Sequence, residues 1–102
     1  MARSKQTKTN ATPGFAIEIK DDTELGLAML VAEDEEGRYE PVGVVVSINE
    51  AREIAASNMA YRRKQLDRGG DPGICPYEYK VWAQGSDGDY RLASTISAAN
   101  LP

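Results

Sequence analysis

A single amphipathic segment, residues 48–68, constrains the fold of this sequence more than any other feature. Ser47 precedes the segment and Glu50 follows three residues later, which is the capping-box pattern of a helix start. Gly69-Gly70 supplies a left-handed stop, and Pro72 prevents continuation. Side chains that can face a core recur at three- and four-residue steps: they are Ile48, Ala51, Ala55, Met59, Arg62 and Leu66. The pattern predicts one helix that buries one stripe.

The residues before this helix predict strands. Residues 15–20 alternate apolar and polar side chains, as a half-buried strand does. Residues 25–33 are ambiguous, because their Leu, Ala and Met content favours a helix while their alternation favours a strand. An acidic, Gly-containing loop and the β-branched run 39–46 follow, so we interpret the two runs as a hairpin. Pro41 cannot donate a backbone hydrogen bond and predicts an edge or a bulge.

The residues after the helix predict a second hairpin. Residues 69–76 form a loop, and residues 77–84 then alternate, with Tyr79 and Val81 on one face and Lys80 and Trp82 on the other. Residues 85–88 contain an Asp-Gly pair, which tolerates positive φ in a tight turn. Residues 90–96 alternate again and supply the partner strand.

These elements define an α+β fold in the order β-β-β-α-β-β. We expect a mainly antiparallel sheet of about five strands, with one amphipathic helix packed on one face. Residues 1–13 read as a flexible basic arm, residues 14–97 as a single domain, and residues 98–102 as a loose C-terminal tail. One helix leaves the other face of the sheet to water, the arm, a ligand or another subunit.

The absence of histidine excludes several chemistries. The 102 residues contain no histidine and one cysteine, Cys75. A Ser/His/Asp triad, a Cys–His pair, an intramolecular disulfide and a multi-thiolate zinc site therefore cannot form. We predict no cofactor and favour a non-catalytic role. An enzyme would have to use carboxylates, Lys, Tyr, Ser or Cys75, for which the sequence shows no constellation.

Compartment and charge set further expectations. No apolar run reaches the ~18–20 residues that cross a bilayer, and residues 1–10 lack the apolar region of a secretory signal, so we expect a cytoplasmic protein with no membrane contact.

The net charge is −4, but no acidic residue precedes Glu18. Residues 2–7, ARSKQT, resemble the start of the mature tail of a core histone, ARTKQT. Mimicry of that tail is one interpretation, and weak electrostatic contacts of a basic arm are the simpler one.

The leading functional hypothesis is an interaction module that self-associates through an exposed sheet face or edge. Most oligomers of soluble proteins are closed homodimers, so a homodimer is the expected assembly, with another protein as a further partner. The candidate contact residues are the valines before the helix and the aromatic side chains after it: Val42, Val44, Val46, Tyr77, Tyr79 and Trp82.

The alternative hypothesis is binding of nucleic acid or another anionic partner at the end of the helix. Cations neutralise phosphate and neighbouring aromatic faces stack on bases. The same cations also complement the helix dipole, and the domain is acidic overall, which makes nucleic acid the less favoured partner. The candidate residues are Arg62, Arg63, Lys64 and Arg68.

Two weaker sites complete the sequence-based hypotheses. Residues 33–36 and the pair Asp87 and Asp89 are oxygen-rich, but solvated hairpin turns need such residues and neither stretch has the spacing of a calcium loop. Cys75 lies between Ile74 and Pro76, and we expect it to be a small buried hydrophobic residue instead of a reactive thiol.

Overall fold

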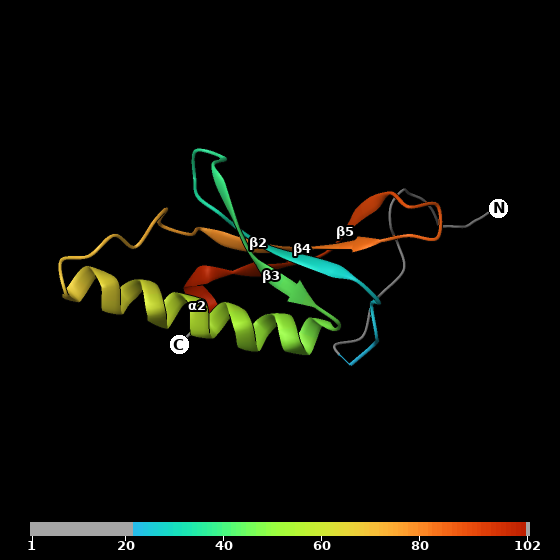
Figure 1. Ribbon diagram of the computed structural model, residues 1–102, viewed down its shortest axis with the longest axis horizontal. Helices are drawn as coiled ribbons and strands as arrows, with labels where there is room; N and C mark the ends of the chain where they lie inside the picture. Colours follow the sequence, from blue (N-terminus) through green and yellow to red (C-terminus); the bar gives the residue numbers. More distant parts are fainter. Residues whose placement is uncertain (1–21, 102) are drawn as a thin grey trace.

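A four-stranded sheet and one long helix form two layers in the computed structural model, which describes residues 22–101 (Figure 1). The α+β class with a single helix on the sheet is confirmed. Four strands lie within the described residues, fewer than the five expected, and the strand predicted for residues 15–20 falls outside them. The elements are β2 (Ala28–Glu33), β3 (Tyr39–Val45), α2 (Ile48–Asp67), β4 (Glu78–Gln84) and β5 (Tyr90–Ser97).

The sheet has the order β3-β2-β4-β5, with every neighbouring pair antiparallel. Both predicted hairpins form, and the ambiguous run before the first turn contributes the strand β2. Gly37 and Gly88 take φ of 84° and 88° in the two hairpin turns, a backbone region that glycine adopts without strain. Pairing of β2 with β4 joins the hairpins, so β2 and β4 occupy the centre of the sheet.

The capping pattern predicted for α2 is present, with one difference. The Ser47 Oγ accepts from the Glu50 N–H at 3.0 Å, as expected. The Glu50 carboxylate accepts from the N–H of Val46 at 2.8 Å, and not from that of Ser47. The helix ends at Asp67, with Arg68 as its C-cap and Gly69 at φ 76°. Side chains therefore satisfy free backbone groups at the start of the helix, and glycine terminates it.

The core lies between α2 and one face of the sheet. Helix residues Ile48, Ala51 and Ala55 are buried there with side chains from all four strands. The strand residues of this cluster are Ala28, Leu30, Ala32, Val45, Tyr79, Val81 and Ile96. Leu66 was predicted to continue the buried stripe, but it is 63% exposed because the C-terminal end of α2 reaches beyond the strands (Figure 1).

Residues 98–101 pack on the domain, whereas we expected a loose tail. Ala98–Asn100 form a 3-10 turn, and the Ala98 N–H donates to the Tyr77 carbonyl at 3.1 Å. Ala98 is buried and Leu101 packs against the core. This turn covers the end of the core next to the start of β4.

Replacement of Ser47 by alanine should lower the free energy of unfolding by about 1 kcal/mol, because the N-cap hydroxyl is lost. Ser57→Ala is the matched control, since Ser57 is exposed in the middle of α2 and alanine favours a helix interior. Urea unfolding followed by circular dichroism measures both. Equal effects of the two substitutions would show that the cap does not stabilise the domain.

Candidate interaction surface on the open face of the sheet

A row of apolar side chains crosses the face of the sheet that is opposite to α2. Cross-strand pairing aligns Met29 of β2 with Val44 of β3 on one side and with Trp82 of β4 on the other. Trp82 in turn pairs with Leu92 of β5. Side chains at paired positions of adjacent strands lie on the same face of a sheet. Val44, Met29, Trp82 and Leu92 therefore form one continuous line, the apolar row.

Charged side chains lie at the other end of the same face. The row next to the apolar row contains Pro41, Val31, Lys80 and Thr95. The row beyond it, the acidic row, contains Tyr39, Glu33, Glu78 and Ser97. The open face is thus apolar at the end where β2 begins and acidic at the end where β2 finishes.

One irregularity in each edge strand determines which side chains lie at the two ends of the apolar row. Val42 is an extra residue of β3. It has no partner in β2, where Leu30 pairs with Gly43 and Val31 with Pro41, and it packs against the core. In β5 the pairing shifts at Ala93, so Leu92 faces outward while Ile96 is buried. An extra residue in a strand reverses the face on which the following side chains lie. Strict alternation along β3 or β5 would therefore have assigned the residues at one end of the strand to the wrong face of the sheet.

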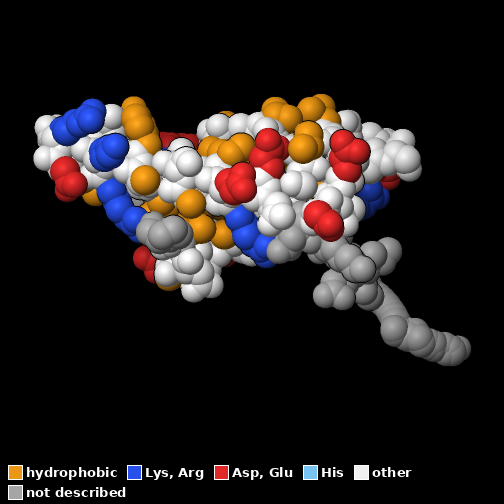
Figure 2. Space-filling view, turned by 90° about the horizontal axis from the view of Figure 1, so that it is seen from below, with side chains coloured by type: hydrophobic (Ala, Val, Ile, Leu, Met, Phe, Trp, Pro, Cys, Tyr) orange, Lys and Arg blue, Asp and Glu red, His pale blue; other side chains and the backbone are white. Residues whose placement is uncertain are grey.

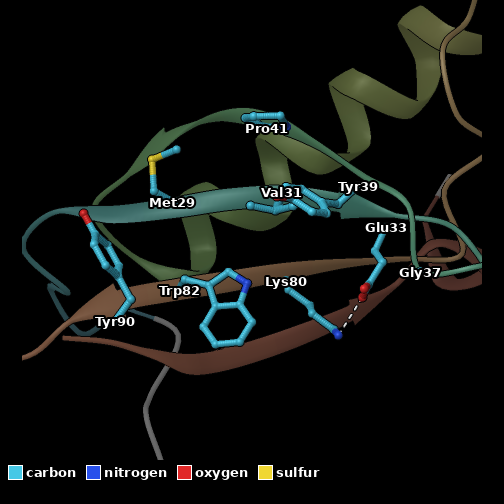
Figure 3. Close-up of a pocket in the computed structure, with 9 residues that line it drawn as sticks. All are labelled: Met29, Val31, Glu33, Gly37, Tyr39, Pro41, Lys80, Trp82 and Tyr90. Carbon is cyan, nitrogen blue, oxygen red and sulfur yellow. Dashed lines mark ion pairs between the residues drawn. The ribbon is translucent and has the colours of Figure 1, made fainter.

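Aromatic side chains line a shallow groove of about 560 Å³ on this face (Figure 3). Tyr39, Trp82 and Tyr90 lie on the same side of the sheet as Met29, with α2 behind the strands (Figure 3). Within residues 22–101, neither the indole N–H of Trp82 nor the two tyrosine hydroxyls has a hydrogen-bond partner. The groove therefore combines apolar area with free polar groups that a partner could contact.

An ion pair closes the acidic end of the groove. The Lys80 Nζ lies 2.6 Å from the Glu33 carboxylate and 3.5 Å from that of Glu78. The hydrogen bond to Glu33 raises the pKa of Lys80 above its ordinary value. Because these side chains are each about a quarter exposed, the pair keeps Lys80 charged and positioned but adds little to stability.

The six predicted contact residues do not share one surface. Val44 and Trp82 lie in the apolar row. Tyr79 has no exposed surface: it lies in the core, and its hydroxyl donates to the Asn58 side chain at 2.7 Å. Burial raises the pKa of Tyr79, an effect that nearby arginines oppose. Val42 also faces the core, whereas Val46 and Tyr77 are exposed just outside the strands.

Several residues of the open face escaped the sequence analysis. Met29 and Val31 alternate correctly in the sequence, but their strand was not connected with the aromatic strand β4. Tyr90 and Leu92 were placed in one alternating series with Ile96, which the irregularity at Ala93 divides between two faces. The available signal was alternation within each strand; the register between strands was not visible.

Arg62, one of the four predicted anion-binding residues, is an internal structural group. Its guanidinium is buried, and its Nη1 donates to the Glu40 carboxylate at 2.8 Å and to the Pro72 carbonyl at 2.7 Å. Its Nε donates to the Asn58 side chain at 2.7 Å. Gly73 fits closely against this pair, since a Cβ there would come within 2.8 Å of both Glu40 and Arg62 atoms. Arg62 thus ties α2 to β3 and to the following loop.

The other three basic residues remain at the surface. Arg63, Lys64 and Arg68 are exposed near the C-terminal end of α2, where Figure 2 shows Lys and Arg side chains gathered at one end of the molecule with a carboxylate among them. The structure therefore separates Arg62 from the other three. Tyr79 is buried in the core, so it offers no face for base stacking beside these three residues, which weakens the case for nucleic acid.

The acidic residues of the two hairpin loops stabilise turns. Burial raises the pKa of the Asp34 carboxyl, but hydrogen bonds from the backbone and side chain of Arg38 outweigh it and leave that pKa lowered. A hydrogen bond from the Arg91 side chain lowers the pKa of Asp87 to about 2.

Cys75 is exposed, contrary to our expectation of burial. Among the described residues, no group of acidic or cysteine side chains could hold a metal ion.

No protein-family model, curated protein or solved structure shows a significant match to this chain. Within residues 22–101, no helix is both long and apolar enough to cross a membrane.

Replacement of Arg62 by alanine should lower the free energy of unfolding by about 3 kcal/mol, because Glu40 and two carbonyls lose their shared donor. Lys64→Ala is the matched control: Lys64 lies on an exposed part of the same helical turn, and its loss should cost less than about 0.5 kcal/mol. Chemical unfolding measures both variants. Similar small losses would contradict the structural role assigned to Arg62.

Proposed function

We propose that this chain is a small, non-catalytic interaction module that buries the open face of its sheet against another polypeptide. The apolar row is the observation that carries this proposal. Val44 and Leu92, at its two ends, are 53% and 46% exposed, although both lie in strands of the sheet. An apolar line that spans four strands is longer than the single exposed side chains common on protein surfaces.

The arrangement of the open face supports a protein partner in two ways. Its apolar row and its charged end together offer the apolar and the polar contacts that protein interfaces combine. Trp82 and the tyrosines Tyr39 and Tyr90 belong to the residue types that contribute most to binding energy in such interfaces. Burial of apolar area on this face would contribute roughly 25 cal/mol for each Å² removed from water.

A non-catalytic role is supported by the way the described residues use their carboxylates. Asp34 and Asp87 accept hydrogen bonds within hairpin turns, Glu33 pairs with Lys80, and Glu40 pairs with Arg62. The pKa values of Asp34 and Asp87 are lowered, whereas a carboxyl that transfers a proton at neutral pH needs a raised pKa. The acids therefore serve the fold and the ion pairs.

A photo-crosslinking residue at position 92 should form discrete adducts in the cells that produce the protein, because Leu92 ends the apolar row. The same residue at position 66 is the matched control, since Leu66 is equally apolar and exposed but lies on α2. Adducts are measured by gel electrophoresis and mass spectrometry.

Met29→Glu in the same chain should remove the adduct at position 92, because it places a charge in the centre of the apolar row. Thermal unfolding of this variant confirms that the domain still folds. Absence of any adduct at position 92, or adducts of equal yield at both positions, would contradict the proposed function.

A further inference from the structure

We infer that the polypeptide bound by the open face is a proline-rich segment in the polyproline II conformation, with a lysine or arginine at one end. This inference rests on the proposed function and names the chemistry of the partner. Three features of the face support it: its aromatic side chains lie on one line, their polar groups can donate hydrogen bonds, and the line ends beside carboxylates.

One side chain from each strand contributes to a line that crosses the open face obliquely, the aromatic diagonal. Each step to the next strand also moves two residues along it, toward the end of the sheet where β2 begins. Cross-strand pairs fix these positions: they join Tyr39 to Glu33, Val31 to Lys80, and Trp82 to Leu92. The members of the diagonal all line the groove (Figure 3), and they are, in order, Tyr39, Val31, Trp82 and Tyr90.

The spacing of the aromatic diagonal is close to the repeat of a polyproline II helix. Adjacent strands lie about 4.8 Å apart and two residues along a strand span about 6.6 Å, so successive members are roughly 8 Å apart. A polyproline II helix has three residues in each turn and rises about 9 Å per turn. Each turn of such a helix can therefore contact one member of the diagonal. The whole diagonal, roughly 24 Å long, accommodates about eight residues.

The polar groups of the diagonal suit a partner with many free carbonyls. Within residues 22–101, the indole N–H of Trp82 and the hydroxyls of Tyr39 and Tyr90 have no hydrogen-bond partner, and each can donate. The central strands β2 and β4 have neighbours on both sides, so the middle of the face offers no free strand edge. A helix uses its carbonyls internally. Polyproline II carbonyls have no internal partner, and prolines pack well in aromatic-lined grooves.

Carboxylates beside Tyr39 select a cationic residue at that end of the segment. Glu33 is the cross-strand partner of Tyr39, and Glu78 pairs with Glu33 in the acidic row. The two carboxylates share the ammonium group of Lys80, which leaves one negative charge in excess. A lysine or arginine there would meet this charge and lie against the Tyr39 ring, which is 69% exposed. The proline run would then extend over Trp82 to Tyr90.

Isothermal titration calorimetry with synthetic peptides tests the inference. The probe is a run of about eight prolines with one arginine, placed at either end because a polyproline II helix can bind in both directions. The probe should bind saturably. A peptide of equal length and charge, with alternating glycine and serine in place of proline, should bind roughly tenfold more weakly or less. Replacement of the arginine by glutamate should weaken binding by a factor of about three or more.

Substitutions in the chain assign the binding to the aromatic diagonal. Trp82→Ala and, separately, Tyr39→Ala should each weaken binding of the probe roughly tenfold. Tyr61→Ala is the matched control and should bind as the unsubstituted chain does, because Tyr61 is 59% exposed but lies on α2. Thermal unfolding checks that each variant folds, and the exposed Tyr39 keeps the test valid if Trp82→Ala does not.

Three results would overturn the inference. They are equal affinity for the glycine-serine peptide, unchanged binding by the folded Tyr39→Ala and Trp82→Ala variants, and no saturable binding of the probe up to about 1 mM. Equal affinity for the glutamate peptide would remove the cationic residue from it. The adducts at position 92 in cells decide the proposed function separately. If they form while the probe fails, the module binds a partner of different chemistry; if neither is seen, the proposed function fails as well.

Discussion

Packing of one helix against one face of a sheet is the constraint on which the rest of the structure depends. Small side chains of α2, Ala51 and Ala55, are buried with Leu30 and Val81 of the two central strands, which closes the core on that side. The chain has no second helix within residues 22–101 to cover the other side. An antiparallel sheet can tolerate a solvated face when that face is polar. Here it carries the apolar row, and this combination leads to the interpretation of the domain as an interaction module.

Rigid attachment of the helix makes the open face a stable platform. The buried Arg62 connects α2 to Glu40 of β3 and to the carbonyls of Pro72 and Ile74, so the overhanging end of the helix and the loop into β4 are held together. The hairpin turns are fixed by Asp34 and Asp87. These polar contacts lie at the margins of the core, where they set the positions of strands, while the apolar row remains on the surface.

The sequence predicted whatever depends on local pattern. The helix, its capping residues, both hairpins and the outward position of Trp82 followed from periodicity and turn residues. What depends on pairing between distant residues was not predictable: Glu40 lies 22 residues from Arg62, so the stripe position of Arg62 was visible but its partner was not. Likewise, the irregularities at Val42 and Ala93 exist only relative to a neighbouring strand. The apolar row is assembled from four strands, and no single strand reveals it.

Fluorescence of Trp82 tests the central claim most directly, because it is the single tryptophan of the chain and lies in the middle of the apolar row. Acrylamide quenching and the emission maximum should be measured as the proline peptide with arginine is added, alongside calorimetry of the same samples. If a polypeptide covers the open face, quenching should fall and the emission should shift to shorter wavelength as the complex forms. Emission of a solvent-exposed indole that stays constant while calorimetry shows binding would contradict burial of this face in the complex.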